Sequence, residues 1–332
     1  MMSTREPRRP TLAGADDTSA PRSTWGPSDW VRRGPDDVAQ VLTDPALDAQ
    51  LRRDGFVRFP LVSAAEAADL RSAYGYLHGW SGSGFLPDLT IDDPLYRRRV
   101  RAVLGASLDD LVSARFVSHV PFLRNYLCKW MGEDSDLYLH QDWMYVDERT
   151  SSGGTYVTWI ALQDIDGHNG QLQVLPGSHL LDRSLRGTEL TGPWVELDDV
   201  IRPRLVTVPV KAGDCVVFDN ALVHCSYPNF TPEPRVVATV VMRPSDSPMA
   251  YFRRVDDATA ARYDVDQDFL CWATPQQLTA APPDLPVAEL IEVAPLDITP
   301  AALAEFLDAR RPVPTVGSRL VAAVERVRER LR

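Results

Sequence analysis

LHQDW at residues 139–143 and HCS at residues 224–226 mark the stretch that decides the fold. Two imidazoles and one carboxylate, in the order His-x-Asp and then His, are the ligand set that holds non-haem Fe(II) and leaves positions open for other ligands. In a strand, residues i and i+2 point to the same face, so a strand through His140 would bring Asp142 to the same metal. His224 follows 82 residues after Asp142, which leaves room for several strands to return it. The sequence therefore predicts a metal site made of these three residues.

Three further runs complete the pattern around these ligands. LQVLPGSH at residues 172–179 is typical of a strand that ends in a tight turn, and KAGDCVVF at residues 211–218 of a turn followed by a buried strand. Ser226 and Arg235 follow His224 by two and eleven residues. Together with DGFV at residues 54–57, these runs resemble the phytanoyl-CoA dioxygenase family of iron and 2-oxoglutarate dependent oxygenases, over about residues 50 to 245.

The resemblance implies a mainly β fold with flanking helices, the double-stranded β-helix or jelly-roll barrel of cupin type. It implies Fe(II), 2-oxoglutarate as co-substrate and O2, with 2-oxoglutarate converted to succinate and CO2. Arg235 stands where the family binds the far carboxylate of 2-oxoglutarate, and Ser226 matches a serine that bonds the same group. In related halogenases a small residue replaces the metal carboxylate. Asp142 therefore favours oxygen transfer, with hydroxylation as the default outcome, while desaturation, epoxidation and ring closure stay open.

Other residues near the ligand strands are candidates for co-substrate and substrate contacts. Trp159 falls near a family position in the co-substrate pocket, although a role in the barrel core is an almost equal alternative. Asn125 and Lys129 precede the first ligand strand at about the distance where relatives place a co-substrate contact. We predict that Gln141, Trp143 and Tyr145 contact the substrate. For Gln141 the alternative is that it points to solvent.

Length and composition indicate an ordinary soluble globular protein: 332 residues, 44% hydrophobic and 24% charged. The net charge of -11 argues against a nucleic-acid surface. The first residues lack an apolar signal region, and no apolar run approaches the ~20 residues of a membrane span. Four cysteines without CxxC spacing suggest reduced, buried thiols. We therefore expect a cytoplasmic enzyme, monomeric or homodimeric, that acts on a small molecule.

The chain divides into three predicted parts. Residues 1–35 hold five prolines and little apolar content, so we expect a disordered tail. Residues 36–245 form the oxygenase domain, and residues 246–332 a helical extension packed on it. The expected helices cover 38–53, 67–77 after a capping box at Ser63 and Glu66, and 96–112. The expected strands cover 56–59, 116–129, 137–143, 156–162, 172–175, 205–210, 215–218 and 236–242.

Several segments keep two interpretations. The loop at 78–94 is an active-site edge or plain surface, and the polar stretch at 182–203 is a lid, a binding loop or a flexible insertion. The arginines at 97–99 and 101 form a solvated helix face, or an electrostatic lure for an anionic substrate or a CoA-type phosphate. Pro at position 275 and at position 300 marks predicted helix starts. An apolar stripe along 316–331 packs on the core or makes a dimer contact.

Three functions compete. The first is an oxygenase of specialised, natural-product metabolism. This preference rests on the unmatched C-terminal region, the long insertion and a composition with two lysines against 33 arginines, which suggests a GC-rich coding genome. The second is another metal-dependent cupin-type enzyme that uses no 2-oxoglutarate, which Arg235 and Ser226 argue against. The third is a non-catalytic ligand-binding barrel, which the intact triad argues against.

Overall fold

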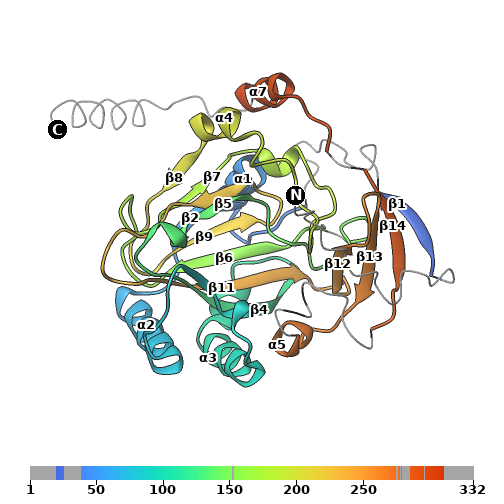
Figure 1. The fold of residues 1–332 in the computed structure, drawn as a ribbon. Helices are drawn as coiled ribbons and strands as arrows, with labels where there is room; N and C mark the ends of the chain where they lie inside the picture. Colours follow the sequence, from blue (N-terminus) through green and yellow to red (C-terminus); the bar gives the residue numbers. More distant parts are fainter. Residues whose placement is uncertain are drawn as a thin grey trace, which may run out of the picture.

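The computed structural model describes residues 20–25, 39–151, 153–273, 276, 278, 285–294 and 296–309. Within these residues the chain forms three sheets, with helices packed on the outside (Figure 1). None of the helices among them is long and apolar enough to cross a membrane. The four cysteines are buried and unpaired, as predicted: Cys128, Cys215, Cys225 and Cys271.

The largest sheet is antiparallel and six-stranded among the described residues. Its order is β2 (Phe56–Pro60), β9 (Asp214–Asp219), β6 (Tyr156–Ala161), β11 (Arg235–Pro244), β4 (His119–Lys129) and β3 (Phe85–Pro87). The central strand β11 reads RVVATVVMRP and is buried at nine of its ten positions. A strand covered on both faces shows such a continuous apolar run rather than an alternating one.

Helices cover the outer face of this sheet. They are α1 (Pro45–Asp54), α2 (Ala64–His78) and α3 (Pro94–Ser113), and α2 and α3 lie beside β4 and β11 in Figure 1. The predicted capping box is confirmed, since Glu66 N donates to Ser63 Oγ and Ser63 N donates to Glu66 Oε2. The helix expected from residue 38 begins only at Pro45, because the Asp44 side chain caps its first turn.

The second sheet faces the first. Its order is β5 (Leu137–His140), β10 (His224–Ser226), β7 (Leu172–Val174) and β8 (Val206–Val208). Val174 and Val208 of this sheet share one apolar cluster with Trp159, Phe218 and Val237 of the first. Two facing antiparallel sheets with flanking helices confirm the predicted mainly β, double-stranded β-helix fold.

The third sheet corrects two expectations. It joins β12 (Ala250–Arg254), β13 (Thr259–Asp264), β14 (Glu289–Val293) and β1 (Arg22–Trp25). The prediction of a helical region beyond 246 is therefore wrong for these three strands. The prediction of a disordered tail is wrong for residues 20–25, because β1 pairs in parallel with β14 and gains the backbone partners that a polar segment lacks alone.

The remaining elements are short. They are η2 (Asp88–Thr90), η3 (Glu133–Ser135), η4 (Ser178–Leu180), α4 (Asp198–Ile201), η5 (Arg202–Arg204), α5 (Phe269–Trp272) and α7 (Pro300–Asp308). The helix start at Pro300 is confirmed, with Thr299 as its cap. The helix start at 275 and the apolar stripe at 316–331 lie outside the described residues. The loop expected at 78–94 contains β3 and η2, which line the site.

Candidate functional site

The three predicted metal ligands meet at one end of the second sheet. His140 is the last residue of β5, His224 is the first of β10, and the two pair across the sheet. One ligand atom from each of His140, Asp142 and His224 lies within 4.8 Å of the other two. Asp142 Oδ1 is 3.6 Å from His140 Nε2 and 4.0 Å from His224 Nε2. Two imidazole nitrogens and a carboxylate oxygen thus converge on one point.

The structural reason for this convergence differs from the predicted one. The strand expected to continue to residue 143 ends at His140, so Asp142 is placed by a loop rather than by strand alternation. Asp142 N donates to Asn220 O at 2.9 Å, and Asn220 Nδ2 donates to Trp143 O at 2.9 Å. Arg186 Nε donates to Asp142 O at 3.2 Å. The carboxylate is therefore held through its backbone by two other segments.

Both histidines are oriented by backbone carbonyls. His140 Nδ1 lies 2.7 Å from Tyr138 O, and His224 Nδ1 lies 2.9 Å from Leu222 O. A proton on each Nδ1 satisfies these carbonyls and leaves each Nε2 with a lone pair for a metal.

Electrostatics favours the ligand forms of two of the three residues. Burial, and then the neighbouring His140, lowers the pKa of His224 to about 4, which keeps its ring neutral. Burial raises the pKa of Asp142, but its interactions with His224, His140 and Arg186 together outweigh burial, so the net shift is downward. For His140, burial lowers the pKa, but the hydrogen bond and charge of Asp142, with the backbone of Tyr138 and His224, together outweigh burial and raise it.

The triad opens into a cavity of about 450 Å³ between the two sheets. The structure brings eight of the predicted site residues beside His140 and His224 in its wall: Asn125, Gln141, Asp142, Trp143, Tyr145, Trp159, Ser226 and Arg235. Lining residues that the sequence reasoning missed include Phe85, Leu89, Leu123, Leu127, Val157, Leu190, Phe218, Thr239, Val241 and Leu278. A signal for some of them exists in the i, i+2 pattern of the strands, since Leu123, Asn125 and Leu127 alternate along β4.

Arg235 is a buried cation in the cavity wall. It is 1% exposed, and neither Nε nor Nη1 has a hydrogen-bond acceptor in the described part of the chain. Its guanidinium carbon lies 5.6 Å from the centre of the Trp159 ring. Burial lowers the pKa of Arg235 to about 10, so it still carries its charge at neutral pH. An unpaired buried charge is costly, and an anionic ligand in the cavity would remove that penalty.

Lys129 does not reach the cavity in which the co-substrate contact is expected, whereas Asn125 does. Lys129 is fully buried and is not part of the cavity wall. Its ammonium donates to Ser135 O and, at 3.0 Å, to Ser226 O, so it supports the strand that carries Ser226. Asn125 does line the cavity, with its Oδ1 accepting from the Thr239 hydroxyl.

Gln141 lines the cavity, and its amide is held by hydrogen bonds to the protein. Its Nε2 donates to Asp182 O at 3.0 Å and to Ala221 O at 2.7 Å, and its Oε1 accepts from Trp194 Nε1 at 3.2 Å. These bonds occupy both amide donors, so Gln141 ties the ligand loop to two other segments.

A buried ion network lies behind the ligand loop. Glu148 accepts from Arg183 Nε at 2.9 Å and from Arg186 Nη2 at 2.8 Å, and Arg183 also pairs with Asp219 at 2.8 Å. Arg186 is the residue that bonds the backbone of Asp142. The network therefore links the loop after β5, the turn that precedes His224 and the segment beginning at residue 182.

Comparisons with known proteins agree with this geometry. The family model described as phytanoyl-CoA dioxygenase (PhyH) matches residues 51–237. Phytanoyl-CoA dioxygenase 1 of Oryza sativa subsp. japonica is 30% identical over 152 residues, which cover 43% of this chain and 50% of the relative. Ectoine dioxygenase of Nocardia farcinica is 29% identical over 224 residues, 55% of this chain and 72% of the relative.

A solved structure of the epimerase SnoN, in complex with Fe3+, alpha ketoglutarate and nogalamycin RO, shares 25% identity. The match covers 77% of this chain and 98% of that chain, with a TM-score of 0.46. The chain spans about half the length of the rice relative and of a similar phytanoyl-CoA dioxygenase from Arabidopsis thaliana. Since the family model covers more than half of its residues, the protein belongs to the phytanoyl-CoA dioxygenase family.

Proposed function

We propose that this protein is a non-haem Fe(II)- and 2-oxoglutarate-dependent oxygenase that hydroxylates a small molecule. The observation that carries the proposal is the joint presence, in one cavity, of the His140–Asp142–His224 cluster and the unpaired guanidinium of Arg235. A metal site alone fits many barrel enzymes. A buried arginine that lacks an anion adds the second requirement, a site for the far carboxylate of 2-oxoglutarate.

The donor set fits Fe(II). The two Nε2 atoms and one carboxylate oxygen would occupy one face of the ion and leave the other face for co-substrate and O2. When bound, iron and 2-oxoglutarate would supply the oxidation of an unactivated C–H bond by O2, with release of succinate and CO2.

The chain's own residues would bind, orient and exclude water. Arg235 would hold the far carboxylate of 2-oxoglutarate through paired N–H donors, beside Ser226 and the Trp159 ring. Trp143 and Tyr145 would form the substrate wall, with Phe218 as part of the apolar lining. We infer hydroxylation rather than halogen transfer because Asp142 fills the ligand position that a halide would need.

Cavity size and lining support a small organic substrate. A volume of about 450 Å³ lies within the range of roughly 300–1,000 Å³ of small-molecule pockets. Leu278, beyond the residues that the family model matches, contributes to the wall. We therefore assign substrate selection partly to the C-terminal region, and place the reaction in specialised, natural-product metabolism.

The test is binding and turnover by wild type, two site variants and one control variant. Wild type, Asp142→Ala and Arg235→Gln would be loaded with Fe(II) without oxygen, and 2-oxoglutarate binding would be measured by calorimetry, with exposed Arg98→Gln as the control. We expect Asp142→Ala to lose iron, and Arg235→Gln to weaken 2-oxoglutarate binding about 10- to 100-fold, since charged hydrogen bonds contribute about 1.5–3 kcal/mol.

Turnover is then followed as succinate, with ascorbate and a panel of candidate substrates. Iron- and Asp142-dependent succinate that rises with one candidate supports the proposal and begins to identify the substrate. If wild type binds iron but not 2-oxoglutarate, the proposal fails and a cupin-type metal enzyme takes its place.

A further inference from the structure

A second buried arginine lies behind strand β4, which is part of the cavity wall. Arg97, on α3, is 3% exposed, and its Nη1 donates to Ala273 O at the end of α5. Its Nε and Nη2 have no acceptor among the described residues. The sequence predicts that the arginines at 97–99 and 101 form either a solvated helix face or an electrostatic lure for an anion. Of these arginines, Arg97 is buried, whereas Arg98 and Arg99 are exposed.

The neighbouring cations are already neutralised. Arg101 pairs with Asp268, and Arg124 pairs with Asp109, with its Nε 2.8 Å from Oδ1. Arg97 has no such carboxylate. Its pKa is lowered by burial, which neighbouring acidic groups offset only in part. Arg97 is therefore the cation of this wall that lacks an anionic partner within the described chain.

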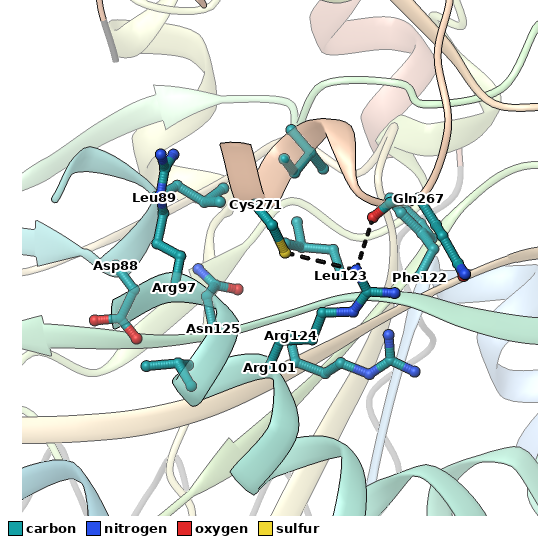
Figure 2. A pocket seen from close by; sticks show the side chains of 12 residues that line it. Asp88, Leu89, Arg97, Arg101, Phe122, Leu123, Arg124, Asn125, Gln267 and Cys271 are labelled. Carbon is teal, nitrogen blue, oxygen red and sulfur yellow. Dashed lines mark hydrogen bonds between the residues drawn. The ribbon is translucent and has the colours of Figure 1, made fainter. Parts of the chain in front are cut away.

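Asp88 is close in sequence but does not neutralise Arg97. Its oxygens accept from Tyr96 Oη at 2.8 Å and from Tyr126 N at 2.8 Å. Figure 2 shows the Asp88 carboxylate and the Arg97 guanidinium pointing in opposite directions. Burial also raises the pKa of Asp88 to about 7, so at neutral pH much of it carries no charge to repel an incoming anion.

A small cavity lies beside Arg97, next to the large cavity. It has a volume of about 10 Å³ and shares Leu89, Leu123 and Asn125 with the wall of the large cavity (Figure 2). Asn125 is oriented by the Thr239 hydroxyl, which donates to its Oδ1. Its Nδ2 makes no hydrogen bond to any described residue. The small cavity is therefore lined by two side chains with N–H donors, Arg97 and Asn125.

We propose that Arg97 and Asn125 form a recognition site for a carboxylate of the substrate, on the same sheet as Arg235 and four residues further along the paired strands β4 and β11. The inference rests on the proposed function and deepens it, because it names an anionic, carboxylate-bearing substrate class. The volume decides against a larger anion: about 10 Å³ admits roughly one water-sized group, so a carboxylate oxygen fits and the phosphates of a CoA nucleotide do not.

Bromide is a suitable first probe because it is a single-atom anion. Crystals of the full chain would be soaked in sodium bromide, and the anomalous signal located. We expect bromide at the Nε/Nη2 edge of Arg97, and a second bromide at Arg235. Signal at Arg235 but water at Arg97 overturns this inference and leaves the proposed function standing. Signal at neither counts against both anion sites.

The second arm tests discrimination between a carboxylate and its neutral analogue. Octanoate and octanamide would be titrated into the Fe(II)- and 2-oxoglutarate-loaded protein without oxygen, followed by emission of the cavity tryptophans Trp143 and Trp159. We expect wild type and exposed Arg98→Gln to bind octanoate at least about tenfold tighter than octanamide. Arg97→Gln should lose that preference.

Arg97→Lys keeps the charge and is the control for a folding defect in Arg97→Gln. It should retain part of the preference, since one ammonium replaces a planar fork of donors. Equal binding of the two probes by wild type, no octanoate binding at all, or an unchanged preference in Arg97→Gln would each overturn the inference. The proposed function is tested separately, by 2-oxoglutarate binding to wild type and Arg235→Gln. A failure of that test is therefore distinguishable from a failure of the Arg97 inference.

Discussion

At the scale of single residues, three buried cations set the character of the site. Arg97, Lys129 and Arg235 are each at most 3% exposed, and none has a carboxylate partner in the described part of the chain. Burying a charge without a counter-charge destabilises the fold. Arg235 lines the large cavity and Arg97 the small one beside it, where a ligand can supply the counter-charge. Lys129 donates to two backbone carbonyls and lies over the Phe85 ring.

Lys129 makes stability depend on pH. Burial, and then the charge of Arg235, lower the pKa of Lys129 from 10.5 to about 7. Between these pH values the unfolded chain binds the proton and the folded chain does not. Stability should therefore rise with pH across this window, by up to about 1.4 kcal/mol per pH unit from this residue.

Comparison with Lys129→Met isolates this contribution from those of other groups. The free energy of unfolding would be measured by urea titration at pH 7, 8 and 9. The difference, wild type minus variant, should increase with pH. A difference that is the same at all three pH values would show that Lys129 does not release its proton in the folded protein.

At the scale of elements, the segment expected as a lid or insertion is tied to the metal ligands. Arg186 and Trp194 are 2% and 1% exposed, and both bond to the ligand loop, Arg186 at Asp142 and Trp194 at Gln141. Leu190, between them, lines the cavity. These contacts argue against a flexible insertion and favour a binding loop.

Glu148 is the carboxylate that holds Arg186, and through it the segment from residue 182, against the ligand loop. Glu148→Gln removes the charge shared by Arg183 and Arg186, so we expect the fold to lose about 3 kcal/mol. We also expect Fe(II) affinity to fall about tenfold, because Arg186 no longer holds the backbone of Asp142. Both are measured, by urea unfolding and by anaerobic metal titration.

Glu196→Gln is the matched control, since Glu196 is exposed in the same segment. It should leave both quantities unchanged. If folded Glu148→Gln binds iron as tightly as wild type, the network supports the fold only and does not position the ligand.

At the scale of the whole molecule, a third sheet joins both ends of the described chain. Arg149 connects three segments: it pairs with Asp147 at 2.6 Å and Glu289 at 2.7 Å, and donates to Ser23 Oγ at 2.6 Å. Glu289 also pairs with Arg262 at 3.2 Å. One mostly buried cluster thus links β1, β13 and β14 to the turn before β6.

Removing the central carboxylate should loosen this sheet. Glu289→Ala leaves Arg149 and Arg262 without a shared partner, and we expect a loss of about 2 kcal/mol in the free energy of unfolding. Glu292→Ala, at an exposed position of the same strand, should change it by less than about 0.5 kcal/mol. Equal effects of the two variants, measured by urea unfolding, would contradict this role for the cluster.

Local sequence was sufficient for the candidate metal ligands, the approximate positions of most strands, one capping box and one helix start. His140, Asp142 and His224 were found from residue type and spacing, and Ser63 and Glu66 from a four-residue motif. Side-chain chemistry and short-range backbone geometry are carried by residues close together in the chain, so they can be predicted from it.

Tertiary structure alone decided the rest. The end of β5 before Asp142, the pairing of β1 with β14, and the burial of Arg97 all depend on contacts between segments far apart in the chain. So does the isolation of Arg235, because the absence of an acceptor follows from everything packed around it. Burial and long-range pairing are properties of the folded chain, and no local pattern specifies which distant residue will contact a given side chain.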